Sequence, residues 1–302
     1  MWFVFAVATT LLWGFAELFY KKGARPDERF SHLKIAVCVG AVMGLHAVYT
    51  LLTQNVGYDP VNLIRYLPVS LLYILSMVLS FFGMRFIEES ISDPIENTSG
   101  AICTFLCFAL LGEKIPFPSV CAISVMVVGI LGIGFLEHRD ESDRTKKFGK
   151  KTAAVAFAMP FLYALLDAFG SFLDIIYLDT ERTPLVGVTE ENIETVANTS
   201  YELTFAVCAA VLFVYILAKG EKPDVRRQGT KILSAVCETL GQFTYVFAMS
   251  GNGAFAAPII SASCVVALLL SRFILKERLT KKQYVFVGLV IAGIIALAVI
   301  EG

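Results

Sequence analysis

PIENTSGAICTFLCFALLGEKIPFPSVCAISVMVVGILGIGFL, residues 94–136, aligns without a gap with PIISASCVVALLLSRFILKERLTKKQYVFVGLVIAGIIALAVI, residues 258–300, at a constant offset of 164 positions. Identical residues occupy several matched positions: Pro94 and Pro258, Ile95 and Ile259, Ser99 and Ser263, Leu106 and Leu270, Glu113 and Glu277, Gly129 and Gly293, and Ile130 and Ile294. Each copy contains two long apolar runs joined by a short hinge that carries a glutamate beside cations. An internal repeat in a hydrophobic chain is typical of transporters whose binding site lies between two halves.

The composition predicts an integral membrane protein. Hydrophobic residues make up 57% of the 302 residues, charged residues make up 17%, and the mean hydropathy is +0.71. A soluble domain, in contrast, is about 45–50% apolar and about 25% charged. The net charge of −1 gives no support for nucleic acid as a partner. The seven cysteines lie in apolar runs without a Cys-x-x-Cys pair, so we expect small hydrophobic side chains and neither a metal nor another cofactor.

We expect ten transmembrane helices, because a span needs roughly 20 apolar residues to cross a hydrocarbon core of about 30 Å. The ten apolar runs lie at 2–20, 33–54, 63–87, 94–111, 116–136, 152–178, 200–218, 231–250, 254–275 and 283–300. Five helices per copy is an odd number, so the second copy must lie upside down relative to the first. The predicted fold class is an all-α integral membrane protein with two inverted five-helix repeats.

The two repeats are expected at 1–138 and 152–302, joined by a basic cytoplasmic linker at 139–151. In the first helix of each repeat, Trp13 falls on Tyr163 and Glu17 falls on Asp167, at an offset of 150. The difference of 14 positions between this offset and the offset of 164 fits an insertion in the loop 179–199.

Lysine and arginine residues indicate the orientation of the chain. They gather in the loops after spans 1, 5, 7 and 9, whereas the loops after spans 2, 4, 6 and 8 hold little beyond Arg65, Lys114 and Arg182. The positive-inside rule therefore places both termini and the acidic loop 179–199 outside the cytoplasm. The opposite orientation would place all of this basic charge outside. We expect a multi-pass protein of the cell membrane.

Several of these features together resemble a known family. Ten spans, an inverted repeat, the Trp13-Gly14 pair in the first span and a Gly-Glu-Lys or Lys-Glu-Arg hinge resemble the drug/metabolite transporter superfamily, specifically its EamA-type members. The resemblance covers essentially the whole chain, and the hinge with its following helix, containing Gly129 or Gly293, is the most specific part. It implies secondary transport of small metabolites or toxic organic compounds through a central cavity. The long loop 179–199 departs from the compact family pattern.

Acidic residues in or near the spans are functional candidates, because an ionisable group at the bilayer centre costs at least about 2.5–3.5 kcal/mol. Local patterns give some of them a structural interpretation. Residues Asp93–Glu96 (DPIE) have the pattern of a helix N-cap, a first-turn proline and a capping-box glutamate, and Glu202 follows the same pattern. Glu113 and Glu277 lie in hinges beside cations. Asp174 lies one turn from the outer end of its span and could reach water.

Asp167 and the stripe formed by Glu238, Gln242 and Tyr245 remain after this selection. Asp167 lies near the middle of the sixth span without a local cap or lysine, so we expect it to face a cavity or the bundle interior. Glu238, Gln242 and Tyr245 share one helical face at i, i+4 and i+7. Such a stripe faces a cavity or hydrogen-bonds to another helix. We predict that all four residues bind substrate and that Asp167 and Glu238 also bind the coupling proton.

Glu17 and His46 are two further candidates with structural alternatives. Glu17 could bind substrate, or could pair with Lys21 at i+4 as an interfacial ion pair. His46 lies deep in the second span, where an imidazole could take up a proton at physiological pH. The alternative for His46 is a hydrogen bond to a neighbouring helix.

Aromatic residues accompany the acids of the first and sixth spans. Trp13 shares a helical face with Glu17, and Tyr163 shares one with Asp167, both at i and i+4. An aromatic face beside a carboxylate is how proteins hold organic cations. The repeat would place two such pairs around one midplane cavity. The alternative is that these rings pack or anchor at interfaces, since aromatic residues make up 12% of the chain.

The predicted function is secondary active transport of a small amine-containing metabolite, an organic cation or an amino-acid-like zwitterion, coupled to protons by alternating access. The alternatives are an exporter of neutral metabolites or drugs without proton coupling, or a lipid-carrier translocator. The chain has no His-Glu-x-x-His, Gly-x-Ser-x-Gly or Walker pattern, so we expect neither an enzyme nor a pump driven by ATP. The expected partners are a small-molecule substrate, the proton and the lipid bilayer, with the chain acting as a monomer or homodimer.

Overall fold

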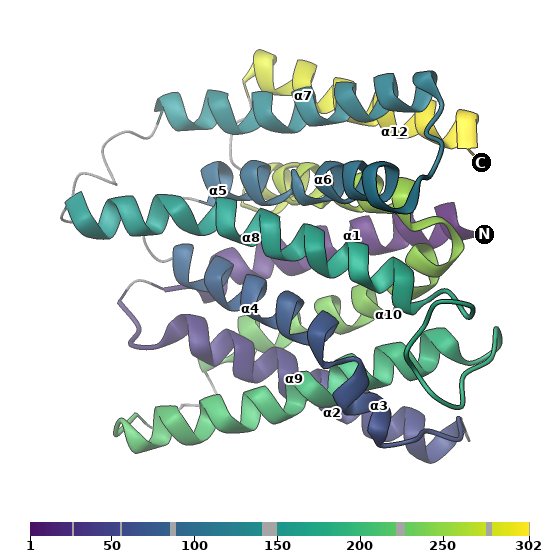
Figure 1. Cartoon of the computed structure of the whole chain (residues 1–302). Helices are drawn as coiled ribbons and strands as arrows, with labels where there is room; N and C mark the ends of the chain where they lie inside the picture. The colour runs from purple at the N-terminus through teal and green to yellow at the C-terminus, as the bar shows by residue number, and fades with distance from the viewer. Residues whose placement is uncertain are drawn as a thin grey trace.

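The computed structural model describes residues 1–25, 27–54, 56–84, 89–140, 150–221, 227–275 and 280–301. Within these ranges every regular element is a helix, and the helices lie side by side in one bundle with both termini at the same end (Figure 1). The α-helices are α1 (Trp2–Gly23), α2 (Ser31–Thr53), α3 (Val61–Arg65), α4 (Leu67–Gly83), α5 (Glu89–Glu96), α6 (Ser99–Leu106), α7 (Phe117–Asp140), α8 (Lys150–Tyr177), α9 (Ile193–Ala218), α10 (Gly229–Ile260), α11 (Ser263–Leu270) and α12 (Lys281–Glu301).

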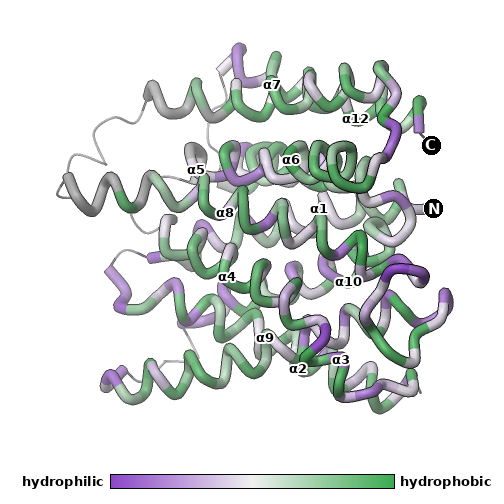
Figure 2. The backbone as a smooth tube through the Cα atoms, in the orientation of Figure 1, coloured by the Kyte–Doolittle hydropathy of each residue, from purple (hydrophilic) through white to green (hydrophobic). Residues whose placement is uncertain are grey.

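Seven helical segments of the described chain are long and apolar enough to cross a membrane: Trp2–Gly23, Ser31–Thr53, Ser92–Leu111, Ala158–Tyr177, Ile193–Ala218, Gly229–Ile260 and Lys281–Glu301. Three shorter apolar segments, Leu67–Gly83, Phe117–Ile133 and Ser263–Ile274, lie among them. Hydrophobic residues follow the helices along most of their length, and hydrophilic residues gather in the loops (Figure 2). Large apolar side chains such as Leu52 and Val299 are 80% and 81% exposed. A bundle with this much exposed apolar surface is suited to a lipid environment.

Three helix boundaries differ from those expected. The helix expected from residue 200 begins at Ile193, because a helix can extend beyond the apolar run that marks the membrane-crossing part. The runs expected at 231–250 and 254–275 are joined through α10, which bends at Asn252, where the backbone is not helical. The run expected at 63–87 is divided into α3 and α4 on either side of Tyr66. The basic linker at 139–151 lies largely outside the described residues, as do Lys276, Glu277 and Arg278 of the second hinge.

Two helix breaks occur at matching positions of the sequence repeat, as turns at 97–98 between α5 and α6 and at 261–262 between α10 and α11. α6 is continued by a π-helical segment, Cys107–Leu111, and α11 is continued by a second one, Ser271–Leu275. Each of these bounds is separated from its counterpart by the same 164 positions as the sequences. Pro94 and Pro258 lie shortly before the two breaks, and proline weakens a helix because it lacks the N–H group and its ring clashes with the preceding turn.

The close contact between α7 and α12 has the same symmetry. A Cβ atom added at Gly129 would lie 2.5 Å from Cγ2 of Val290, and one added at Gly293 would lie 2.4 Å from Cγ of Met126. Val290 and Met126 are themselves separated by 164 positions. Glycine at these two positions therefore allows the two helices to approach closely, as small residues do in membrane bundles.

The remaining helices pack in pairs around the centre of the bundle. α1 packs along α10 and α11, while α8 packs along α4, α5 and α6. α2 packs on α9, and α7 packs on α12. The centre of the bundle is therefore surrounded by α1, α4, α8 and α10 together with the broken helices, and this is where the candidate site lies.

Candidate functional site

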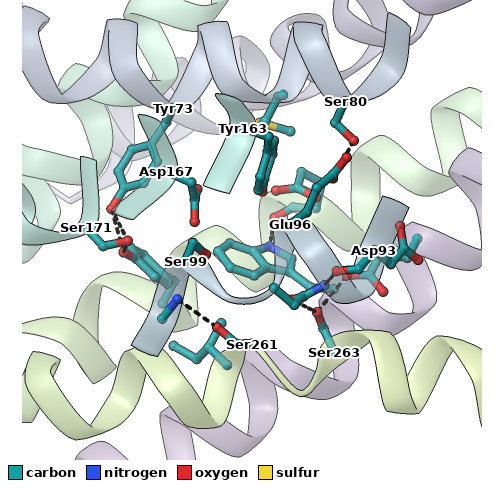
Figure 3. Close-up of a pocket in the computed structure, with 18 of the residues that line it drawn as sticks. Tyr73, Ser80, Asp93, Glu96, Ser99, Tyr163, Asp167, Ser171, Ser261 and Ser263 are labelled. Atoms are coloured by element: carbon teal, nitrogen blue, oxygen red, sulfur yellow. Dashed lines mark hydrogen bonds between the residues drawn. The ribbon is translucent and has the colours of Figure 1, made fainter. Parts of the chain in front are cut away.

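A cavity of about 920 Å³, including the space through which it opens to solvent, lies among α1, α4, α5, α6, α8, α9, α10 and α11 (Figure 3). Its lining includes all seven residues that the sequence predicts as substrate-binding: Trp13, Glu17, Tyr163, Asp167, Glu238, Gln242 and Tyr245. These residues come from α1, α8 and α10, so the fold brings together positions that are far apart in the chain.

Five carboxyl groups line the cavity, and four of them, those of Glu17, Glu96, Asp167 and Glu238, lie on four different helices. We call these four the acidic cluster. Oε1 of Glu17 accepts a hydrogen bond of 2.6 Å from the Ser263 hydroxyl group. Oε2 of Glu17 is buried and has no hydrogen-bond partner in the described part of the chain. One carboxylate oxygen in the cavity is therefore available to a ligand or a proton.

Hydroxyl groups hold Glu96 and Glu238 in place. Ser80 on α4 donates a hydrogen bond of 2.7 Å to Oε2 of Glu96, and Ser92 donates one of 2.6 Å to Oε1. Tyr20 on α1 donates a hydrogen bond of 3.1 Å to Oε2 of Glu238. Glu96 and Glu238 are 6% and 7% exposed, so the contacts orient carboxyl groups that are almost fully buried.

Asp167 is surrounded in a similar way. The hydroxyl groups of Ser99 and Tyr163 lie beside its carboxyl group (Figure 3). Hydroxyl groups can form hydrogen bonds with a carboxyl group whether it is ionised or protonated, because a hydroxyl group both donates and accepts hydrogen bonds. Among the described residues that line the cavity, none is a lysine or an arginine. Because a buried charge without a counter-charge is costly, the acidic cluster must be neutralised by protons or by a bound cation.

Aromatic rings form one wall of the cavity next to the acidic cluster. Trp13 stacks on Tyr245 with ring centroids 5.1 Å apart and an angle of 26° between the rings. The indole N–H of Trp13 donates to the backbone carbonyl of Glu238 at 3.4 Å. The hydroxyl groups of Tyr245 and Tyr73 are 2.5 Å apart. These contacts fix the orientation of the rings, so aromatic faces and carboxyl groups border the same space.

The two helix breaks contribute polar groups to the floor of the cavity. The backbone N–H of Gly100 donates a hydrogen bond of 3.2 Å to Oγ of Ser261, which joins the two broken helices. The Ser263 hydroxyl group lies 3.3 Å from Oδ1 of Asn97. Non-helical backbone at membrane depth is tolerated where it lines a cavity, and broken helices at matched positions are typical of transporter binding sites.

The family of the chain follows from comparison with known proteins. The model of the EamA-like transporter family matches residues 1–135 and 183–299. The chain belongs to the EamA-like transporter family. It is thus a multi-pass membrane protein of a family of small-molecule transporters, which confirms the resemblance found in the sequence.

The fold of this EamA-like transporter is also found in a solved structure. A crystal structure of another protein matches 98% of this chain and 96% of its own chain, with 12% sequence identity and a TM-score of 0.72. At this identity the match shows the fold alone. A comparison with curated proteins found no match in sequence.

His46 of the transporter lies apart from the cavity. Its Nδ1 atom is 2.7 Å and 2.8 Å from the two carboxyl oxygens of Glu202 on α9, and its ring contacts that of Phe243. The N-cap expectation for Glu202 is wrong, because α9 begins at Ile193 and Glu202 is fully buried inside the helix. The pair is the contact with a neighbouring helix that we gave as the alternative for His46. A proton bound by His46 would therefore act between α2 and α9.

A second, more open cavity lies at the end of the bundle that carries the termini. It has a volume of about 1060 Å³, including open solvent. Its charged lining residues are Glu113, Asp179, Arg182, Glu190 and Glu194. We call it the acidic vestibule. Burial raises the pKa of Glu113, and nearby Arg182 opposes this effect.

Sequence reasoning missed Glu96 and Asp93. The N-cap expectation for them is wrong, because α5 begins upstream at Glu89 and both side chains line the cavity. The repeat itself contained the signal, since Glu96 occupies the position of Ile260 in the second copy and both line the cavity. If Glu96 served only to begin a helix, the matched position of the second copy would need a similar residue, but that position is the apolar Ile260.

Sequence reasoning also missed the environment of Asp174. The expectation that it reaches water is wrong, because its side chain is fully buried and accepts a hydrogen bond from Tyr66. Tyr20, Tyr73 and Tyr201 line the cavity as well, and no local pattern distinguishes them from tyrosines that only pack.

Proposed function

We propose that this transporter exchanges protons for a small amine-containing metabolite, an organic cation or an amino-acid-like zwitterion, bound in the central cavity. The observation that supports this most strongly is the acidic cluster, four carboxyl groups around one cavity whose described lining contains no lysine or arginine. A cation neutralises such a cluster when it enters, and protons neutralise it when the cation has left. Exchange of the two is the simplest cycle in which the cavity never holds several unbalanced charges.

The aromatic wall supports the same class of substrate. Ammonium groups are attracted to the faces of Trp and Tyr rings, and the interaction is strongest where water is excluded. Trp13, Tyr163 and Tyr245 all border the space next to Asp167 and Glu238.

We further propose ten spans arranged as two inverted repeats, 1–138 and 152–302, that rock against each other. The packing supports this. The first helix of the first repeat, α1, packs on α10 of the second repeat, and the first helix of the second repeat, α8, packs in the equivalent way on α4 of the first. The matched breaks after Pro94 and Pro258 support it as well. The segment 139–151 would link the two halves.

We propose that both termini face outward from the cell membrane, as the positive-inside rule predicts. The acidic vestibule would then face outward as well. The central cavity extends toward the other end of the bundle, where Tyr20, Met84 and Asp93 line it. Toward the vestibule it is bounded by the hydrogen-bonded hydroxyl groups of Tyr73 and Tyr245. This conformation would therefore be open toward the cytoplasm.

The test is uptake of radiolabelled amines by proteoliposomes with and without a pH gradient, combined with the release of protons when amines bind to purified protein in weak buffer. We expect saturable uptake that the gradient drives, and proton release on binding. A neutral isostere of each amine, with carbon in place of nitrogen, is the matched control. It should show no uptake driven by the gradient and should release no protons on binding. Equal transport of amine and isostere would support the neutral-metabolite exporter instead, and binding of phosphorylated lipid carriers alone would support the translocator.

A further inference from the structure

Asp174 is a buried acid that the proposed exchange does not yet use. It lies on α8, is 0% exposed, and lines neither the central cavity nor the acidic vestibule. One of its oxygen atoms accepts the hydrogen bond from Tyr66. The other, Oδ2, is buried without a hydrogen-bond partner in the described part of the structure. An ionised carboxyl group in this state would be poorly compensated, whereas a protonated one would place an O–H at Oδ2.

Among the described residues, the ionisable groups near enough to interact electrostatically with Asp174 carry no positive charge. They are Tyr66 before α4, Tyr73 on α4, Cys103 on α6, Tyr201 on α9 and Tyr245 on α10, and Asp167 lies two turns away on the same face of α8. Hydroxyl and thiol groups are neutral at physiological pH. A proton is therefore the simplest ligand that can neutralise Asp174.

Polar groups lie between Asp174 and Asp167 of the acidic cluster. Asp167, Ser171 and Asp174 lie on one face of α8 at i, i+4 and i+7, and span about 10 Å along the helix axis. Tyr73 and Tyr245 donate hydrogen bonds of 3.2 Å and 3.1 Å to Oγ of Ser171. Hydroxyl groups both donate and accept, so this triad can pass a proton along by reversing its hydrogen bonds.

The other side of Asp174 approaches the acidic vestibule. Ile175 and Leu178, which follow Asp174 on α8, line the vestibule. The ring of Tyr66, the hydrogen-bond donor to Asp174, packs edge-on against that of Tyr177, with centroids 5.6 Å apart. Asp174 therefore lies between the two cavities, in the layer that separates them.

We propose that Asp174 is a second proton-binding site that relays protons between the acidic vestibule and Asp167. A proton from vestibule water binds the Asp174 carboxylate. A proton then passes from Asp174 through the hydroxyl groups of Ser171, Tyr73 and Tyr245 to the Asp167 carboxylate. The hydroxyl groups end neutral, as they began, with their hydrogen bonds reversed. This proposal rests on the proposed exchange of protons for an amine, and it assigns the path by which the proton arrives.

The experiment separates exchange of substrate from accumulation driven by protons. Proteoliposomes containing Asp174→Asn are assayed for counterflow of labelled amine without a pH gradient and for accumulation with one. We expect counterflow within about twofold of the unaltered protein and loss of the accumulation. Asp167→Asn should lose both activities. Glu181→Gln, an exposed acid of the loop after α8 that lines neither cavity, is the matched control and should keep both.

Accumulation that persists in Asp174→Asn would overturn the proposal, as would loss of counterflow and accumulation in equal proportion. Infrared difference spectra between acidic and alkaline buffer give a second readout, independent of transport. A protonated-carboxyl band that disappears in Asp174→Asn is expected, and an unchanged spectrum would count against the site. If the unaltered protein transports no amine at all, the proposed function fails, and the infrared result still decides whether Asp174 binds a proton.

Discussion

Replacing Glu28 with glutamine should destabilise the protein, because this residue holds two buried lysines at the end of the bundle opposite the termini. Glu28 lies in the loop between α1 and α2. Its Oε2 atom is 2.8 Å from Nζ of Lys231 on α10, and its Oε1 atom is 3.0 Å from Nζ of Lys34 on α2. Lys231 and Lys34 are 1% and 7% exposed. The network therefore joins the loop between α1 and α2 to the beginnings of α2 and α10.

The size of the effect follows from the partners that remain. Breaking a buried ion pair by removing one member costs about 3–5 kcal/mol, because the other charge stays buried without compensation. Glu28 is 19% exposed, and Lys34 keeps a second partner, Glu221, at 3.3 Å. The loss then falls mainly on Lys231, so we expect Glu28→Gln to lower the free energy of unfolding by about 3 kcal/mol.

Denaturant titration in a mild detergent measures this loss, and a second variant tests its cause. The double variant Glu28→Gln with Lys231→Met removes the uncompensated charge, and replacing a buried pair by apolar groups is often neutral. The double variant should therefore be at least about 2 kcal/mol more stable than Glu28→Gln alone. A single variant as stable as the unaltered protein, or a double variant no better than the single one, would refute the reasoning.

Three further predictions concern the same structure. Burial disfavours the charged form of Glu28, but hydrogen bonds from Lys231 and Lys34 outweigh burial and lower the pKa of Glu28. The stability that the lowered pKa contributes should be present above the ordinary pKa of 4.5 and should be lost as the pH falls below that value. Denaturant titrations at several pH values measure this loss. Glu96→Gln should weaken amine binding roughly tenfold or more in equilibrium titrations, because a hydrogen bond to a charged group contributes about 1.5–3 kcal/mol; unchanged affinity would remove Glu96 from the site. Gly129→Ala should lower the free energy of unfolding by about 1–3 kcal/mol through overpacking against α12, whereas Gly288→Ala, where an added Cβ meets no atom within 4 Å, should not.

The sequence predicted the residues of the cavity better than their surroundings. Asp167, Glu238 and Glu17 were selected because a charge inside an apolar run has to face a cavity or a partner, and this argument needs only the run itself. All three line one cavity. Their roles in binding stay predictions.

The missed residues share a physical reason. Capping patterns describe contacts between a residue and its neighbours within four positions. DPIE fits a helix start, yet α5 begins at Glu89, and the contact of Glu96 with Ser80 lies 16 positions away in the chain. His46 and Glu202 are 156 positions apart. Local patterns hold no information about such long-range contacts.

Binding of a cation next to Trp13 tests the central claim most directly. The chain has two tryptophans, so Trp2→Phe leaves Trp13, which lines the cavity, as the single fluorescent reporter. The protein is titrated with amines and with their neutral isosteres, and the same titration is repeated with Asp167→Asn. The account predicts a saturable change in Trp13 fluorescence with amines alone, with the affinity reduced at least about tenfold in Asp167→Asn. An equal response to the neutral isosteres, or an affinity for amines that Asp167→Asn leaves unchanged, would contradict it.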